Sequence, residues 1–199
     1  MKTLCWKCRG IGDPATAREL RDLVKECMPS VLCLVETQLS KQRVEGLAST
    51  LDFDSAFAVA SSGGSGGLCM YWKSSLNLQI KTFSKYHIDS IIMEDGKDPW
   101  RLTCFYGEAT RTLRHLSWQM LCFLRGESTL PWMCLGDFNE VLCREEHLGI
   151  NEREGWQMDN FREAIDICGL CDIGIRDWFG PLRNVWLAGV TVGSGWTGR

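Results

Sequence analysis

The sequence predicts an α/β fold, arranged as a sandwich more than as a simple doubly wound sheet. Short apolar runs of strand length recur along the chain, and helix-like segments with apolar residues at three- and four-residue spacing lie among them. A block of strand-like runs without intervening helices, at about 68–106, favours the sandwich. The 199 residues, 45% of them hydrophobic, are enough to bury a full core, as one large domain or as two small ones.

The first two elements carry the clearest local signals. Asp13 is a capping carboxylate followed by Pro14 in the first turn, and apolar residues then recur at helical spacing up to Cys27. This pattern predicts a helix at residues 13–27. The run 31–35 is continuously apolar, as expected of a strand that is buried on both faces.

The same two patterns predict the remaining elements. In chain order they are a helix from Ser40 to Leu51, a strand at 55–60, a Ser/Gly loop at 61–67, strands at 68–72, 76–83, 88–93 and 101–106, a helix at 110–124, a strand at 132–135 and a helix at 157–168. We expect the four strands between 68 and 106 to form an antiparallel meander. After residue 174 the only strand-like run is 185–192.

Composition and charge narrow the classes of function. The formal net charge of -3 and the pI of about 5.7 exclude bulk attraction to nucleic acid, so any contact with a polyanion must be local. No apolar stretch is long enough to cross a bilayer, and no hydrophobic signal segment follows the N-terminus, so we expect an intracellular protein without membrane contact. Most of the eleven cysteines lie in apolar runs, which favours reduced thiols. The pairs Cys5/Cys8 and Cys168/Cys171 leave a zinc site open as an alternative.

A carboxylate stands at the carboxyl end of each of two predicted buried strands. Glu36 follows the run 31–35, and Asp137 follows the run Trp132-Met-Cys-Leu-Gly. Ligands bind at the carboxyl ends of strands in open α/β sheets, and Mg²⁺ is commonly held by one or two carboxylates. Asn139 adds an amide that could orient a phosphate or a water, and Gly136 permits a close backbone approach. The alternative is that these residues are solvated loop or helix-cap residues.

Five motifs occur in a characteristic order: Trp6-Lys-Cys-Arg-Gly10, Glu36-Thr37, Gly66-Gly-Leu68, Phe105-Tyr-Gly107 and Gly136-Asp-Phe-Asn139. Together they resemble the endonuclease/exonuclease/phosphatase superfamily, whose members share a deoxyribonuclease I-like α/β sandwich. The sequence is most similar to the endonuclease domain of plant LINE-type retrotransposons. The resemblance extends over residues 1–174, and 175–199 is a diverged tail, so that C-terminal strands of the fold are missing or altered.

The resemblance implies roles for individual residues. Glu36 and Asp137 would hold Mg²⁺ or Mn²⁺, and Asp137 would also activate or orient the attacking water. Tyr106 would contact the phosphate, and Asn139 would position the phosphate or the nucleophile. The implied reaction is divalent-metal-dependent hydrolysis of DNA phosphodiester bonds in the nucleus, with no small-molecule cofactor.

Two departures from the family pattern indicate that this activity is impaired. Lys7 stands where the family motif has asparagine, and a cation there would repel Mg²⁺ or substitute weakly for part of its charge. The family's Asp-His dipeptide is absent from the chain, and the three histidines, His87, His115 and His147, lie in other contexts. A frameshift or splicing change over about the last 25 residues would account for the tail.

Three functions therefore stay open. The first is a DNA-nicking domain. The second is another enzyme of the superfamily, such as an abasic-site nuclease or a phosphoinositide phosphatase. The third is a non-catalytic remnant that at most binds nucleic acid, which Lys7 and the absent Asp-His dipeptide favour over an active nuclease.

Overall fold

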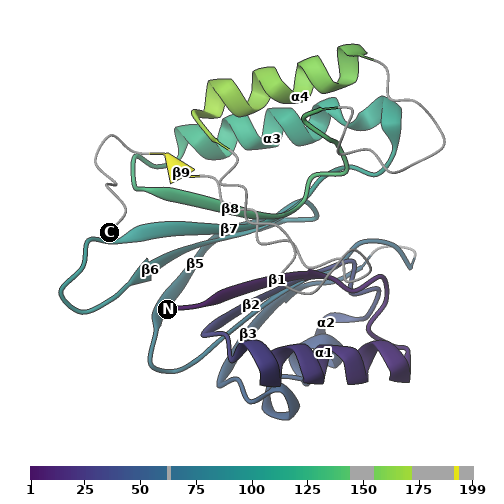
Figure 1. Ribbon diagram of the computed structural model, residues 1–199, viewed down its shortest axis with the longest axis vertical. Coiled ribbons are helices and arrows are strands. Elements are labelled where there is room, and N and C mark those ends of the chain that lie inside the picture. Colours follow the sequence, from purple (N-terminus) through teal and green to yellow (C-terminus); the bar gives the residue numbers. More distant parts are fainter. Residues whose placement is uncertain (62–63, 144–154, 172–190, 193–199) are drawn as a thin grey trace.

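The computed structural model describes residues 1–61, 64–143, 155–171 and 191–192. Two β-sheets pack face to face, and helices cover the outer face of each sheet (Figure 1). The α/β sandwich predicted from the sequence is confirmed. None of the helices in these ranges is both long and apolar enough to span a membrane.

The first sheet has the strand order β1-β2-β4-β3. Its strands are β1 (Thr3–Lys7), β2 (Val31–Val35), β3 (Ser55–Val59) and β4 (Leu68–Trp72). Strands β1 and β2 are parallel, whereas β4 is antiparallel to both β2 and β3. Helices α1 (Pro14–Cys27) and α2 (Lys41–Glu45) and the 3-10 helix η1 (Ser49–Leu51) accompany this sheet.

The second sheet has the order β5-β6-β7-β8-β9. Its strands are β5 (Asn77–Ser84), β6 (His87–Met93), β7 (Trp100–Tyr106), β8 (Trp132–Asp137) and β9 (Thr191–Val192). Strands β5, β6 and β7 run antiparallel, and β7 and β8 are parallel. Its outer face carries α3 (His115–Gly126), preceded by the 3-10 helix η2 (Arg111–Leu113), and α4 (Gly155–Cys168) (Figure 1).

Three apolar layers hold these elements together. The first lies between α1 and the first sheet and includes Leu4, Trp6 and Leu20. The second lies between the two sheets, and the third between the second sheet and helices α3 and α4. Because apolar side chains leave both faces of the first sheet, its central strand β2 is apolar throughout, whereas β6 and β7 of the second sheet also carry the buried polar residues Asp89 and Arg101.

The first helix forms as its sequence predicts. The Asp13 side chain accepts a 2.9 Å hydrogen bond from the backbone N–H of Thr16, and Pro14 occupies the first turn. Met28 ends the helix in the left-handed conformation, with φ of 46°. This exit turns the chain directly into β2.

Three predicted elements differ from the structure. Strand β4 does not join a meander with β5 to β7, because its two edges pair with β2 and β3 in the other sheet. The helix predicted from Ser40 to Leu51 is divided into α2 and η1, and Ser40 makes no side-chain cap. The helix predicted at 110–124 begins as η2, and α3 starts only at His115.

Several expectations lie outside the described residues. These are the predicted domain boundary at 174/175, His147, and the tail at 175–199 except for β9. Strand β9 lies within the run 185–192 that the sequence predicts to be extended, and it pairs antiparallel with Trp132 and Met133 of β8.

Candidate active site

The candidate residues meet where four strands end. Strands β1 and β2 are parallel, with Lys7 opposite Val35 and Glu36 following directly. Strands β7 and β8 are also parallel, with Tyr106 opposite Asp137. Because the two sheets face each other, the carboxyl ends of these four strands form one edge of the sandwich (Figure 1). The structure therefore brings Glu36, Tyr106, Asp137 and Asn139 together, as their positions after strands predict.

Tyr106 connects the two sheets at this edge. Its hydroxyl donates a 2.7 Å hydrogen bond to Oε1 of Glu36. Burial raises the pKa of the Tyr106 hydroxyl, and the hydrogen bond to the Glu36 carboxylate raises it further. Tyr106 is therefore a neutral hydrogen-bond donor at neutral pH.

Asp137 and Asn139 form a tight turn at the end of β8. The backbone N–H of Asn139 donates to Oδ1 of Asp137 at 2.9 Å, and the Asn139 amide donates to the carbonyl of Gly107 at 2.7 Å. Asn139 has φ of 55°, a left-handed conformation that asparagine tolerates better than most residues. The turn fixes the orientation of the Asp137 carboxylate.

Gly136 makes the approach of β8 to β7 possible. Its φ is 149°, and a Cβ atom at this position would overlap the carbonyl oxygen of Phe105 on the neighbouring strand. Only glycine fits there without displacing the β7 backbone. Gly136 thus lets β8 lie close to β7 and thereby fixes the position of the next residue, Asp137.

The second carboxylate, that of Glu36, also belongs to a residue with a positive φ angle. Glu36 has φ of 58°, and its carbonyl accepts a 2.8 Å hydrogen bond from Gly10. Thr37 is fully buried, and its N–H donates to the carbonyl of Gly67 at 3.1 Å. Such backbone conformations persist where surrounding contacts enforce them, and they concentrate at functional sites.

Lys7 lies between the two carboxylates. Its Nζ is 2.5 Å from Oδ2 of Asp137 and 3.2 Å from Oε1 of Glu36. The side chains of Lys7, Glu36 and Asp137 are 15%, 16% and 10% exposed, so water screens these ion pairs only in part. The ammonium therefore neutralises much of the negative charge of the site.

The arrangement does not fit a divalent cation as it stands. Glu36 and Asp137 are hard oxygen donors and lie close enough to share one cationic atom, but that atom is Lys7 Nζ. In the described part of the chain, no group of three or more His, Cys, Asp or Glu side chains is placed to hold a metal. The alternative zinc site is not assembled there, since Cys5 and Cys168 belong to different apolar layers.

The other reactive side chains lie apart from this chemistry. His87 is buried at the start of β6, with its ring nitrogens 3.1 Å from the Thr82 hydroxyl and 2.9 Å from the Ser84 hydroxyl. His115 is exposed at the start of α3. Burial raises the pKa of the Cys8 thiol to about 12, so Cys8 is not a thiolate nucleophile at neutral pH.

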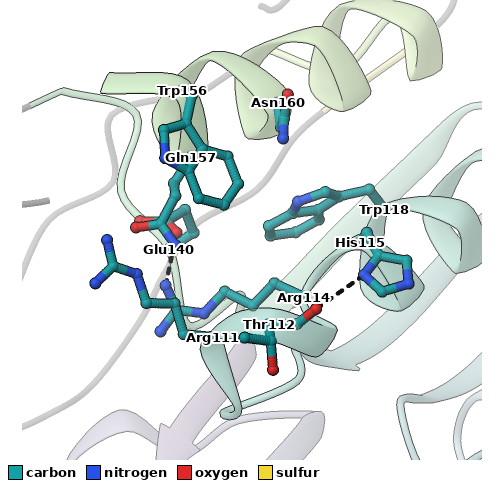
Figure 2. Close-up of a pocket in the computed structure, with 9 residues that line it drawn as sticks. All are labelled: Arg111, Thr112, Arg114, His115, Trp118, Glu140, Trp156, Gln157 and Asn160. Carbon is teal, nitrogen blue, oxygen red and sulfur yellow. Dashed lines mark hydrogen bonds and ion pairs between the residues drawn. The ribbon is translucent and has the colours of Figure 1, made fainter. Parts of the chain in front are cut away.

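A small pocket of about 50 Å³ adjoins the turn after β8, between the start of α3 and α4 (Figure 2). It has room for a few water molecules. Within it, Arg114 Nη1 lies 2.7 Å from Oε2 of Glu140, whose side chain is 1% exposed. This ion pair anchors the residue that follows Asn139, so it positions the turn that carries Asp137 and Asn139. Sequence reasoning missed it, and the only signal was a charged residue directly after the Gly-Asp-Phe-Asn motif.

Comparison with known proteins gives a consistent result. The model of the Endonuclease/Exonuclease/phosphatase family matches residues 4–198, which includes most of the segment 175–199. No curated protein matches the sequence. Nucleases of this family are generally dependent on divalent metals.

Solved structures of similar fold come from several enzymes. The AP endonuclease LMAP of Leishmania major is 18% identical, with a TM-score of 0.64 over 86% of this chain and 68% of that one. The 3' phosphatase NExo from Neisseria, bound to a product DNA hairpin, is 13% identical, with a TM-score of 0.67 over 96% and 86%. The endonuclease domain of TRAS1, a telomere-specific non-LTR retrotransposon, is 14% identical, with a TM-score of 0.66 over 88% and 76%. The deoxyribonuclease I-like sandwich predicted from the sequence is confirmed.

Proposed function

We propose, since the chain belongs to the endonuclease/exonuclease/phosphatase family, that its site hydrolyses phosphodiester bonds in DNA. More narrowly, we propose that this chain is the endonuclease domain of a plant LINE-type retrotransposon, that it acts in the nucleus, and that Lys7 weakens its activity. The observation that carries this proposal is the convergence of Glu36, Tyr106, Asp137 and Asn139 at one edge of the sandwich. The likeness to the TRAS1 endonuclease domain supports the narrower statement.

The site offers what hydrolysis of a phosphodiester needs from protein side chains. Asp137 is held by the Asn139 N–H, so its carboxylate can orient a water molecule for attack on phosphorus. Tyr106 is a neutral donor that can bind a non-bridging phosphate oxygen. The Asn139 amide stands beside both and can orient the same phosphate. No covalent nucleophile is needed.

The resemblance also implies Mg²⁺ or Mn²⁺ at Glu36 and Asp137, where a bound metal would polarise the phosphoryl oxygen and stabilise the leaving oxygen. Lys7 Nζ stands between these carboxylates. A single ammonium supplies one positive charge and no open coordination position, so it replaces a divalent ion poorly. We therefore expect weak hydrolysis by the natural sequence.

The position of Lys7 between the two carboxylates also favours a second candidate function, a non-catalytic remnant that at most binds nucleic acid. In that case the ion pairs of Lys7 with Glu36 and Asp137 would hold the fold together without supporting chemistry. The two candidates differ in one respect that can be measured, namely whether any hydrolysis depends on Asp137.

The test compares the chain with Asp137→Ala on three DNA substrates with Mg²⁺ or Mn²⁺. The substrates are a supercoiled plasmid, a duplex with one abasic site and a duplex with a 3' phosphate. Nicking of the plasmid that Asp137→Ala abolishes supports the endonuclease. Activity confined to the abasic or 3'-phosphate duplex would transfer the proposal to another enzyme of the family. If none of the three is hydrolysed, the remnant is the better account of this chain.

A further inference from the structure

The side chain of Lys7 enters the site because of the pattern of strand β1. Leu4 and Trp6 face the apolar layer beneath α1, whereas Cys5 faces the layer between the sheets. Side chains alternate along a strand, so Lys7 leaves β1 on the same face as Cys5 and toward the second sheet. The long stem then carries Nζ to Asp137, which ends β8 of that sheet.

Two carboxylates that converge at a poorly hydrated edge repel each other unless a cation lies between them. Here the cation is supplied by the chain itself. Nζ is within ion-pairing distance of Glu36 Oε1 and of Asp137 Oδ2, and all three side chains are mostly buried. Both carboxylates also accept hydrogen bonds, since Glu36 Oε1 accepts from the Tyr106 hydroxyl and Asp137 Oδ1 accepts from the backbone N–H of Asn139.

We propose that Lys7 is a tethered cation that takes the place of the divalent ion and keeps Mg²⁺ and Mn²⁺ from the Glu36–Asp137 pair. The chain then folds in the absence of metal with half of the carboxylate charge neutralised by Lys7, and its stability does not depend on divalent ions. Removing the ammonium uncovers a metal site made of residues already in position. This deepens the proposed function, because it concerns the same site, but it does not require that the site hydrolyse DNA.

The proposal makes a thermodynamic statement that is independent of catalysis. A ligand that binds only the folded state raises the midpoint temperature of unfolding as its concentration rises. For the natural chain, MnCl₂ and EDTA should give the same midpoint. Lys7→Asn should melt at a lower temperature in EDTA, because Glu36 and Asp137 then face each other without a counter-charge, and MnCl₂ should raise its midpoint progressively.

The experiment uses the full chain, Lys7→Asn, and Lys7→Asn combined with Glu36→Gln, which removes one carboxylate from the uncovered site. Lys97→Asn is the control, because Lys97 forms an exposed ion pair with Glu94 away from the site. Thermal unfolding is followed by circular dichroism, and Mn²⁺ uptake by the electron paramagnetic resonance signal of the free ion. Lys7→Gln, which keeps more of the stem, is measured alongside in case Lys7→Asn does not fold.

We expect Lys7→Asn or Lys7→Gln to bind Mn²⁺ at least about tenfold more tightly than the natural chain, as loss of one nearby positive charge requires. The double variant should lose this gain, and Lys97→Asn should behave like the natural chain. Equal Mn²⁺ affinity in the natural chain and both Lys7 variants would overturn the proposal, as would a natural chain stabilised by MnCl₂. If Lys7→Asn binds Mn²⁺ but cleaves no DNA, the proposed function fails while this inference stands.

Discussion

Oε1 of Glu36 accepts a 2.7 Å hydrogen bond from the hydroxyl of Tyr106, which ties the end of β2 in one sheet to the end of β7 in the other. The two residues are 70 positions apart in the sequence. The same oxygen lies 3.2 Å from Lys7 Nζ, so two donors fix it. The contact is therefore both a link between the sheets and part of the candidate active site.

Replacing Tyr106 with phenylalanine removes this link and keeps the ring. We expect Tyr106→Phe to lower the free energy of unfolding by about 1–2 kcal/mol, because Glu36 loses one of its two donors. Tyr71→Phe is a matched variant, since the Tyr71 hydroxyl donates to the neutral carbonyl of Val44 in the core. Urea unfolding measures both, and any DNA nicking should fall in Tyr106→Phe alone. A Tyr106→Phe chain as stable as the natural one would show that the link is not formed.

Gly136 should tolerate no side chain. Gly136→Ala places a methyl group against the Phe105 carbonyl, so we expect a loss of more than about 2 kcal/mol in the free energy of unfolding. Gly126→Ala is the matched control, because a Cβ atom at the end of α3 meets nothing within 4 Å, and alanine is the better helix former. Its stability should be unchanged or slightly higher. Equal urea midpoints for the two variants would contradict the close approach of β8 to β7.

His87 should make the fold sensitive to mild acid. Burial lowers the pKa of the His87 imidazole from its usual 6.5 to about 4. Between these two values the unfolded chain binds more protons than the folded chain, so stability falls as the pH falls through this window. At about pH 4 the loss from this one residue reaches about 3 kcal/mol, at roughly 1.4 kcal/mol for each pKa unit.

The measurement is the free energy of unfolding in urea at several pH values between about 7 and 4. His87→Gln should reduce its slope against pH, whereas His115→Gln, at the exposed start of α3, should leave the slope as in the natural chain. The comparison separates His87 from the carboxylates that titrate in the same range. A slope unaffected by His87→Gln would refute this origin of the acid sensitivity.

A buried ion pair holds the strand that carries Tyr106. Arg101 Nε lies 2.7 Å from Oδ1 of Asp89, and both side chains are almost fully buried. We expect Arg101→Leu to lower the free energy of unfolding by about 3–5 kcal/mol, because it leaves the buried Asp89 carboxylate without its cationic partner and with only the Thr103 hydroxyl as a donor. Adding Asp89→Leu should restore most of the loss, since a buried pair can be replaced by apolar residues at little cost. A double variant less stable than the single one, by urea unfolding, would contradict this.

The position of the site could be predicted from the sequence because it follows from local pattern. The apolar runs before Glu36 and Asp137 indicate buried strands, whose carboxyl ends are where ligands bind in α/β sheets. In the structure these strands, β2 and β8, lie in different sheets that pack against each other. The same reasoning failed for β4, which lies in the first sheet. Short apolar runs specify that a strand is buried but not which strands it pairs with, since pairing depends on contacts between distant segments.

The contacts between charged side chains could not be predicted from the pattern of apolar and polar residues in the sequence. Alternation along β1 predicts that Lys7 lies on the inner face of the sheet. It does not predict which carboxylates the flexible side chain reaches. Asp89 and Arg101 lie in two predicted strands that are mostly apolar. From the sequence alone, a charged residue in such a strand could equally lie at an edge that is exposed to solvent. Only the packing of β6 against β7 shows that these two residues pair in the interior.

The initial rate of nicking of supercoiled DNA by Lys7→Asn, relative to the natural chain at equal Mn²⁺, tests the central claim most directly. If Glu36, Tyr106, Asp137 and Asn139 form a phosphodiesterase site that Lys7 holds back, Lys7→Asn should nick at least about tenfold faster. The gain should vanish in Lys7→Asn with Asp137→Ala, and Lys97→Asn should leave the rate unchanged. A Lys7→Asn protein that is folded and loaded with Mn²⁺ yet nicks no faster than the natural chain would contradict the claim.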